Sequence, residues 1–559
     1  MITVFLLISF SCFLTLCSGI LLNNFIKIEK ELELYEYGFL GISFLIFLSL
    51  LIHFFFPLSE NINFLTHLSI ILITTILNKK IIINFLKQNY ILILFCLIFT
   101  TSITIYNKTH EDYGFYHLPY IINIISEKII FGLANIQPQY AWNSTWLNFS
   151  AFFYYPFFQT KSLVLNNSIL YFFILFFFIK NILNIKKFIN FNNFFVICFS
   201  YYFILKFNRL SAFGFDVAAN FFTILCLIYF FYFLSNYQKK NIYFIFIFAI
   251  LAFSIKISSF ITIIICLLSC IILIKKEKKI RLNINVFLYF FLISFLWCTQ
   301  QVIYSGCLFP FFKISCIETL SWYTPNITEA TKNLTGAFNK SYSSYTGSMS
   351  KEEYLKNFNW VSTWFNRNLI EFTEHLSSVL IPSLILILLN LKQNFFKFKF
   401  KGLNNNHLKF LTLFTFIGLI IWFTKSPVIR FGTNYIYGLC FIAIYFFINV
   451  VLKDYKSISK KSIIYVFIIC LTFAFLKNLK KINRNYNDLS YWPIFYNVKY
   501  EHKVTDNFKI YYPVSDSNFH QLKYCWDIPF LCHTNKGEKI KLLNKKNYIF
   551  VISKENEKN

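Results

Sequence analysis

The sequence predicts an all-α integral membrane protein of about 14 transmembrane helices (12–14), followed by a small mixed α/β domain at the C-terminal end. Three observations predict this class. Hydrophobic residues make up 57% of the 559 residues and charged residues only 14%, whereas soluble domains average about 25% charged residues. Apolar stretches of membrane-crossing length recur along the chain, and Lys and Arg gather in alternate loops between them. This composition excludes a soluble globular, disordered, collagenous or disulfide-scaffold protein.

The candidate spans are mostly apolar stretches, because about 20 helical residues cross a hydrocarbon layer of roughly 30 Å. They lie near residues 1–22, 37–58, 62–78, 90–106, 164–180, 193–207, 216–235, 241–254, 257–274, 283–305, 376–392, 409–424, 434–452 and 462–477. The first stretch lacks the basic flank and small-residue cleavage site of a signal peptide, so we interpret it as a retained span. The apolar stretch 147–158 is interrupted by Pro156, and we interpret it as a membrane-surface or re-entrant segment.

The distribution of positive charge predicts the orientation. With the N-terminus outside, the short loops assigned to the cytoplasm hold 24 of the 53 Lys and Arg residues, the longer opposite loops hold 14, and the C-terminal tail, counted from Lys477 at the end of the last span, holds 15. Since cytoplasmic loops carry the excess of positive charge, the net charge of +28 mainly reflects topology and attraction to anionic lipid. A nucleic-acid partner would need a soluble basic domain with aromatic platforms, and the sequence indicates none.

This orientation divides the chain into six parts, three of which are large segments on the outer face. The parts are a four-helix membrane segment at 1–106, a first outer loop at 107–163, membrane helices at 164–305, a second outer loop at 306–375, membrane helices at 376–477 and an extracytoplasmic C-terminal domain at 478–559. In the last part, strand-like runs at 508–514 and 548–553 predict a small α/β or β-rich domain.

The cysteines agree with this orientation. Ten of the 14 lie within predicted spans, where a Cys usually acts as a small apolar residue. The other four form two close pairs in the outer segments, Cys307 with Cys316 and Cys525 with Cys532. Disulfides persist in an oxidising exterior, so each pair is a candidate disulfide, with chance proximity in the sequence as the alternative.

The first outer segment carries the candidate catalytic residues. Glu111, Asp112 and His117 follow the span ending at Tyr106, where a helix leaves the bilayer and ionisable groups are costly unless they are used or solvated. From His117 onward, Leu and Ile recur at helical spacing up to position 129, which predicts an amphipathic helix on the membrane surface. An interfacial aromatic belt with solvated acids is the alternative.

This layout resembles the membrane glycosyltransferases of the C superfamily, multi-span enzymes that use sugar donors linked to polyprenyl phosphate. Their first large outer loop begins with an acidic residue at a helix exit and continues as amphipathic surface helices. The resemblance implies that Asp112, or Glu111, is the catalytic base or a ligand of a divalent cation such as Mg²⁺ or Mn²⁺, and that His117 orients the acceptor or the carrier phosphate. Here the loop follows the fourth predicted span, whereas in that superfamily it usually follows the first.

The chain is also similar to an uncharacterised family of bacterial multi-span membrane proteins. The matching motifs are Tyr116-His117-Leu118-Pro119, Gly132-Leu133-Ala134-Asn135, Asn143 to Trp146, Ser305-Gly306-Cys307 with Pro310, Arg430-Phe431-Gly432, and Cys525-Trp526-Asp527 with Pro529. They form an ordered set over residues 100–435 and a patch near 525. The resemblance implies a place in the bacterial inner (cytoplasmic) membrane, with the large loops and the tail on the periplasmic side.

Further polar residues are expected on the same face. Lys425 and Arg430 lie at the outer end of the twelfth span, and Arg430 is a candidate for gripping the phosphate of a lipid carrier through paired donors; ordinary contact with lipid headgroups is the alternative. Arg209 and Asp216 lie at the entrance to the seventh span, Asp216 either as a helix N-cap or as a second acid of the pocket. Lys256, between two short spans, is expected to snorkel to the surface.

The second outer segment offers aromatic side chains for a sugar. Trp322 and Trp360 are candidates for stacking on it, although aromatic residues near a bilayer usually act as anchors. The polar stretch 341–350 is expected to be a flexible surface loop able to close over a substrate.

Missing motifs narrow the function. The sequence has neither a phosphate-cradling Gly-rich loop nor a His-x-x-x-His metal pair, so ATP-driven transport by this chain alone is not expected. We therefore expect a membrane glycosyltransferase that moves a sugar from a polyprenyl-phosphate donor to a glycan, lipid or protein acceptor on the outer face. The alternatives are a transporter or flippase of lipid-linked sugars and a polymerase or ligase of surface polysaccharide.

Overall fold

The computed structural model shows a predominantly helical protein. It describes residues 2–105, 112–185, 188–207, 214–276, 282–392, 398–400, 405–451, 457–484, 496–505, 508–514, 520–534 and 540–554. In this part of the chain, 11 helices are long and apolar enough to cross a membrane. Their number indicates a multi-pass membrane protein in a lipid bilayer.

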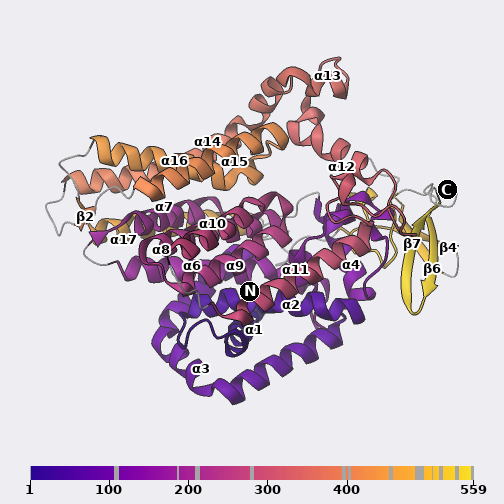
Figure 1. Ribbon diagram of the computed structural model, residues 1–559, viewed down its shortest axis with the longest axis horizontal. Helices are drawn as coiled ribbons and strands as arrows, with labels where there is room; N and C mark the ends of the chain where they lie inside the picture. The colour runs from indigo at the N-terminus through magenta and orange to yellow at the C-terminus, as the bar shows by residue number, and fades with distance from the viewer. Residues whose placement is uncertain are drawn as a thin grey trace.

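The long helices pack as a layered bundle (Figure 1). On one side lie α1 (Ile2–Ile26), α2 (Leu34–Phe55) and α3 (Glu60–Thr104), and on the opposite side α14 (Val361–Lys392), α15 (Asn405–Lys425) and α16 (Ile429–Val451). Between them lie α6 (Leu165–Leu183), α7 (Phe191–Lys206), α8 (Phe215–Asn236), α9 (Lys239–Ile255), α10 (Ile261–Lys276) and α11 (Ile284–Ser305). The last long helix, α17 (Lys460–Arg484), packs against α7, α14 and α3.

The helix α3 combines the two predicted spans 62–78 and 90–106 in one helix of 45 residues. It bends at Asn78, whose backbone leaves helical geometry (φ −127°, ψ 26°). A bend of this kind allows a long helix to change direction without a loop.

Both ends of α3 lie near the first outer segment, and its middle lies far from it. Near the beginning, Asn63 donates a hydrogen bond to the carbonyl of Ala151 (2.9 Å). Near the end, the hydroxyls of Thr104 and Ser168, at the start of α6, are 2.8 Å apart. The middle packs at the beginning of α2, through the ring of Phe85. The helix therefore runs away from the first outer segment and returns to it, as two spans would.

The three predicted outer segments lie together at one end of the bundle, which we call the loop-rich end (Figure 1). Phe131 and Phe550 form a parallel β-bridge between the first outer loop and the tail. Asn135 donates hydrogen bonds to the carbonyls of Trp322 (3.1 Å) and Val551 (2.8 Å). The first outer loop is thus bonded to both the second loop and the tail.

The opposite end of the bundle carries a small sheet (Figure 1). Its strand β1 (Phe188–Ile189) pairs in parallel with β2 (Phe398–Phe400), with Phe188 opposite Lys399, and β2 pairs antiparallel with β3 (Ser457–Ile458). All three strands come from loops that the charge pattern assigned to the cytoplasm. The sheet therefore gathers three of the short basic loops at the end away from the large segments.

The first outer loop is built of short helices that are buried. A π-helical turn, η1 (Tyr113–His117), leads into α4 (Leu118–Ser126), and α5 (Thr145–Ala151) packs against α4 and α2. Every residue of α4 from Leu118 to Ile125 is buried, so the expected surface helix does not lie on the surface. Helix α5 packs against it, and the chain after α2 contacts it through the N–H of Leu58, which donates to the carbonyl of Ile124 (3.0 Å). The stretch 147–158 likewise begins within the buried helix α5.

The second outer loop and the tail complete the loop-rich end. The second loop contains α12 (Ile327–Gly336) and α13 (Lys351–Leu355). The tail contains two antiparallel hairpins, β4 (Tyr500–Thr505) with β5 (Phe508–Pro513) and β6 (Ile540–Lys545) with β7 (Tyr548–Ser553). Both predicted strand runs are therefore present. The structure also contains the disulfides Cys307–Cys316 and Cys525–Cys532.

Candidate functional site

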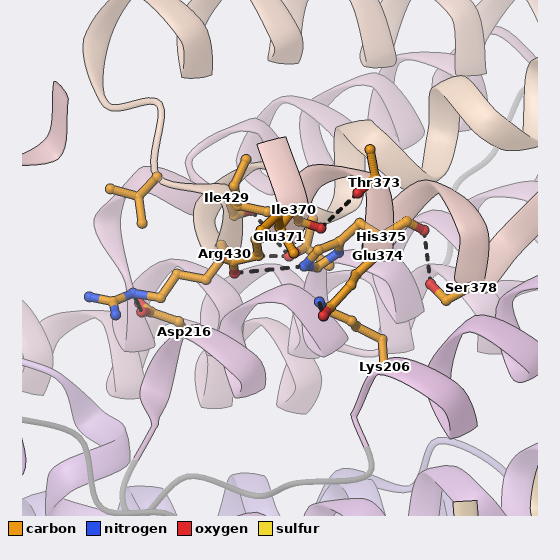
Figure 2. A network of polar contacts seen from close by, with 12 residues as sticks. Lys206, Asp216, Ile370, Glu371, Thr373, Glu374, His375, Ser378, Ile429 and Arg430 are labelled. Carbon is orange, nitrogen blue, oxygen red and sulfur yellow. Dashed lines mark hydrogen bonds and ion pairs between the residues drawn. The ribbon is translucent and has the colours of Figure 1, made fainter. Parts of the chain in front are cut away.

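Two carboxylates and two cations meet where α8, α9 and α16 reach the loop-rich end. Arg430 Nη2 lies 3.2 Å from Oδ2 of Asp112, and Arg430 Nε lies 2.8 Å from Oδ2 of Asp216. Lys256 Nζ forms an ion pair with Oδ1 of Asp216. Figure 2 shows Arg430 reaching from the beginning of α16 to Asp216. We call these four residues the Arg430 cluster; its members come from positions up to 318 residues apart.

The ends of the helices explain how these charges are held. Asp216 lies in the first turn of α8, whose N-cap is Gly214, and the positive end of the helix dipole favours its carboxylate. Lys256 is the C-cap of α9, where a cation is favoured. Arg430 lies in the first turn of α16, where the dipole disfavours a cation, and two carboxylates offset that cost. Asp216 is thus an ion-pair acid and not the helix N-cap that the sequence left open.

The Arg430 cluster is electrically balanced and open on one side. Its two carboxylates and two cations sum to zero formal charge. The exposed fraction of the side chain is 16% for both Asp216 and Lys256, 28% for Asp112 and 42% for Arg430. A ligand that approaches the cluster therefore meets Arg430 and Asp112 before the enclosed pair.

Aromatic side chains line the inner part of the cluster. Lys256 Nζ lies 3.0 Å from the centre of the Phe431 ring, a cation–π contact. Burial lowers the pKa of Lys256 to about 8, although the Asp216 carboxylate opposes this shift. Burial raises the pKa of Tyr116 well above its usual range, and the carboxylates of Asp112 and Asp216 raise it further. At neutral pH, Lys256 is therefore mostly charged and Tyr116 neutral.

A polar cavity adjoins the cluster between α8 and α16. Its lining includes Asp216, Lys256, Asn220, Asn434, Ser258 and Ser259. The cavity volume is about 10 Å³, which is room for one water-sized group.

Two asparagines give this cavity its hydrogen-bonding character. Asn220 Nδ2 donates to the carbonyl of Arg430 (2.8 Å), and its Oδ1 accepts from Asn434 Nδ2 (3.0 Å). This chain of bonds fixes the orientation of both amides. Asn434 Oδ1 is then buried without a hydrogen-bond partner among the residues that the structure describes. The cavity thus offers an acceptor to a hydroxyl group or a water molecule.

His117 lies in the wall behind the cluster. Only 6% of the residue is exposed. Its ring centre is 4.3 Å from that of Tyr116 and 4.9 Å from that of Phe215, which precedes Asp216. The imidazole therefore braces the turn that carries Asp112 against the turn that carries Asp216.

A second polar network lies on α14, beside the cluster. Lys206, at the end of α7, forms an ion pair with Glu374 (3.1 Å). The buried His375 hydrogen-bonds with the hydroxyl of Tyr202 through Nδ1. Figure 2 shows these α14 side chains on the side of Arg430 away from Asp216. Lys206 thus ties α7 to α14.

The remaining predicted site residues are not brought into the cluster. Lys425 is exposed at the end of α15. Trp322 is half-buried, donates to the carbonyl of Val302 (3.3 Å) and packs in the junction between the outer loops and the tail. Trp360 is 1% exposed and has no free face for a sugar. Glu111 and Arg209 lie outside the described residues.

The described residues around Asp112 do not form a site for a divalent metal ion. Among the described residues there is no group of three or more His, Cys, Asp or Glu side chains that could hold one. Asp112 and Asp216 both face Arg430, whose guanidinium occupies the position between two acids that a cation would take. The Mg²⁺ or Mn²⁺ that the resemblance implied therefore has no built site in this part of the chain.

Sequence reasoning missed three members of this region, Lys256, Asn220 and Asn434. Lys256 was expected to snorkel to the surface, yet it is enclosed and paired because Asp216 supplies its counter-charge. The spacing of the two asparagines in the sequence could have identified them. Asn220 follows Asp216 by four positions, and Asn434 follows Arg430 by four, a spacing that places each pair on one face of a helix.

Comparison of the chain with family models matches residues 1–437 to a family described as a domain of unknown function, DUF8201. Comparisons with curated proteins and with solved structures give no match. The matched range contains all four residues of the Arg430 cluster and ends within α16, before α17 and the tail. Because the match covers more than half of the sequence, the chain belongs to the DUF8201 family.

Proposed function

We propose that the Arg430 cluster is the active site of a membrane glycosyltransferase. The donor would be a sugar linked to a polyprenyl phosphate, and the acceptor a glycan, a lipid or a protein. The observation that carries the proposal is the 3.2 Å contact between Asp112 and Arg430 on the open side of the cluster. A carboxylate that accepts a proton and a cation that faces the leaving phosphate are the two groups that sugar transfer needs.

In the proposed reaction, Asp112 takes the proton of the acceptor hydroxyl. The acceptor oxygen bonds to the anomeric carbon of the sugar, and the bond from that carbon to the phosphate oxygen breaks. The electrons of that bond stay on the polyprenyl phosphate. Arg430, through its paired N–H donors, and Lys256 stabilise the negative charge of this leaving group.

Binding of the phosphate would also activate Asp112. Both carboxylates contact Arg430, and a neighbouring cation makes a carboxylate a weaker base. Asp112 is the more exposed of the two acids and the more distant from the guanidinium (3.2 Å against 2.8 Å). An incoming phosphate therefore displaces Asp112 first. Once displaced, the carboxylate recovers basicity next to the bound donor.

The adjoining cavity supports a ligand that carries hydroxyl groups. Asn434 Oδ1 is a buried acceptor, and Ser258 and Ser259 add hydroxyls to the same lining. Buried polar groups need hydrogen-bond partners, and a sugar hydroxyl is a suitable one. The cavity admits a single such group, so most of the sugar would occupy the open side near Arg430.

We extend the proposal to the layout of the C superfamily in a bacterial inner membrane. If α7 (16 residues), α9 (17 residues) and the second limb of α3 also cross the bilayer, the spans number 14. The loop-rich end would face the periplasm. Two observations support this orientation: the loop-rich end holds both disulfides, and the opposite end gathers short basic loops.

The test is replacement of Asp112 by Asn in the full-length protein, with surface glycans and binding of a polyprenyl phosphate as the two measurements. We expect loss of the glycan product, because Asn cannot accept the proton. Binding of the polyprenyl phosphate should persist or tighten, since the neutral amide no longer competes for Arg430. Glu374→Gln is the matched control, because Glu374 is a 65% exposed acid that pairs with Lys206.

Unchanged glycans at equal protein level in Asp112→Asn would reject the glycosyltransferase and favour a transporter or flippase. Glycan units that are still made but no longer joined into chains would instead favour the polymerase or ligase. Loss of phosphate binding in Asp112→Asn would contradict the proposed competition between phosphate and carboxylate.

A further inference from the structure

The turn that carries Asp112 is clamped by the C-terminal tail. The turn η1 follows Asp112 directly, and its Gly114 lies under the indole of Trp526. The backbone N–H of Trp526 donates to the carbonyl of Gly114 (3.0 Å). A Cβ added at Gly114 would lie 2.1 Å from Cε2 of Trp526, far inside van der Waals contact. Only a glycine therefore allows the indole to seat on the turn.

Trp526 is itself held from several sides. It is fully buried, and its ring centre lies 5.7 Å from that of Tyr113 and 4.9 Å from that of Tyr496. Its backbone has φ 45°, a left-handed conformation that a bulky residue adopts at a cost and that persists only when the surroundings enforce it. The Cys525–Cys532 disulfide closes the short loop that contains it.

The clamp and the clamped turn come from different parts of the sequence. Asp112 and Gly114 lie within the residues that match the family, whereas Trp526 lies beyond the last matched position, 437. We propose that Trp526 is a positioning residue that holds the Asp112 turn against Arg430, and that the Cys525–Cys532 disulfide keeps Trp526 in place. The inference about catalysis rests on the proposed function; the inference about the clamp does not.

The experiment compares paired variants of the full-length protein. Amide hydrogen exchange of residues 113–126 is measured on the purified protein in detergent, and surface glycans are measured on cells that make each variant. Gly114→Ala should raise exchange in this segment about tenfold, because the added methyl group pushes the indole away, and should lower the glycan product. Combining Gly114→Ala with Trp526→Leu should restore both readouts in part, since the smaller side chain makes room for the methyl group. Cys525→Ser with Cys532→Ser should raise exchange to a smaller extent.

Phe550→Leu is the matched control. Phe550 also joins the tail to the first outer loop, but it does so by stacking on Phe131 with ring centres 4.4 Å apart. This variant should leave exchange in residues 113–126 unchanged. A rise equal to that of Gly114→Ala would overturn the clamp, because any weakening of the tail would then loosen the turn.

The outcomes separate this inference from the proposed function. Unchanged exchange in Gly114→Ala overturns the clamp. If Gly114→Ala raises exchange but leaves the glycans normal, while Asp112→Asn abolishes the glycans, the positioning role is wrong. The proposed glycosyltransferase function is then still supported. Raised exchange in Gly114→Ala that is partly restored by adding Trp526→Leu supports the clamp. This holds even if Asp112→Asn leaves the glycans unchanged, because unchanged glycans would contradict only the proposed function.

Discussion

Two ion-pair clusters lie at opposite ends of α8 and α9, and they differ in how accessible their charged groups are. Away from the loop-rich end, Glu36 of α2 accepts hydrogen bonds from the backbone N–H of Glu33 (2.9 Å) and the hydroxyl of Tyr229 (3.0 Å), and pairs with Lys240 (2.7 Å). Only 4% of its side chain is exposed. At the loop-rich end, Arg430 serves two acids and remains 42% exposed.

The difference separates a structural ion pair from a candidate active site. Three donors saturate one carboxylate at Glu36, so the cluster joins α2, α8 and α9 without offering a group to a ligand. The Arg430 cluster has an accessible guanidinium and an acid that can be displaced from it. Helix α9 contributes a lysine to each, Lys240 at its beginning and Lys256 at its end, about 24 Å apart along the axis. These two lysines allow the comparison to be tested on one helix.

The largest expected effect is on stability, from Lys240→Met. Loss of the ammonium leaves the Glu36 carboxylate buried without its cation, which should lower the free energy of unfolding by ~3 kcal/mol. Lys256→Met should cost only ~1 kcal/mol, because Asp216 keeps Arg430 as a partner. Thermal unfolding in detergent measures both. Equal losses of the free energy of unfolding in the two variants would show that both clusters have a structural role.

The next effect is on activity, from Arg430→Gln. If Arg430 holds the phosphate, the rate of transfer should fall by ~10²–10³-fold, the usual loss when one donor to a developing negative charge is removed. Arg430→Lys should be intermediate, because a lysine keeps the charge but loses the paired donors.

Lys313→Gln is the matched control for Arg430→Gln. Lys313 forms a surface ion pair with Glu318 (3.4 Å) with 76% of its side chain exposed, and a pair of this kind contributes little. Transfer at the normal rate in both variants would mean that the accessible guanidinium binds no substrate group.

The comparison also shows which parts of the molecule can be predicted from sequence. Charge alternation and two close cysteine pairs were enough to group the outer segments, because both depend on composition near helix ends. The candidates Asp112, Asp216 and Arg430 were each found as charged residues at the end of a predicted span; for Asp112, the argument was that ionisable groups at a helix exit are costly unless used. Their contact with one another needed tertiary structure, since Asp112 and Arg430 are 318 positions apart in the sequence.

Burial was the property that sequence could not supply. Lys256 and the helix α4 were both assigned to the membrane surface from their own residues, and both are enclosed because distant segments cover them. The predicted span 62–78 ends at the bend at Asn78, but the helical continuation from there to the next predicted span was not expected. An amphipathic pattern indicates which face is apolar and does not indicate what lies over the other face.

A smaller effect is expected from pH, through Lys256. The groups that face its ammonium are Asp216, Asp112 and Arg430, which keep their charges between about pH 7 and 9. As pH rises through about 8, Lys256 loses its proton, the cluster becomes net negative, and the KM for a phosphate-linked donor should rise several-fold, measured in transfer assays.

Stability should rise with pH over the same range, although the affinity for the donor falls. Because the pKa of Lys256 is lower in the folded protein than in the unfolded chain, the penalty for burying its charge is present below about pH 8 and is relieved above it. Lys256→Arg is the control, since a guanidinium keeps its charge throughout. A rise in KM that persists in Lys256→Arg would assign the pH dependence to another group.

The smallest effect is expected from Asn434→Leu, which fills the polar cavity without touching an ion pair. The lost hydrogen bond to Asn220 should cost ~1 kcal/mol of stability. The lost acceptor should raise the KM of a sugar donor whose hydroxyl binds to it by about fivefold.

Asn192→Leu is the matched control. Asn192 is also a buried amide that donates to a backbone carbonyl, that of Phe231 (3.0 Å), at the far end of α8. It should lower stability to a similar extent and leave KM unchanged. Similar KM values for the two variants would mean that the cavity beside Arg430 is filled by water and that the sugar lies wholly on the open side.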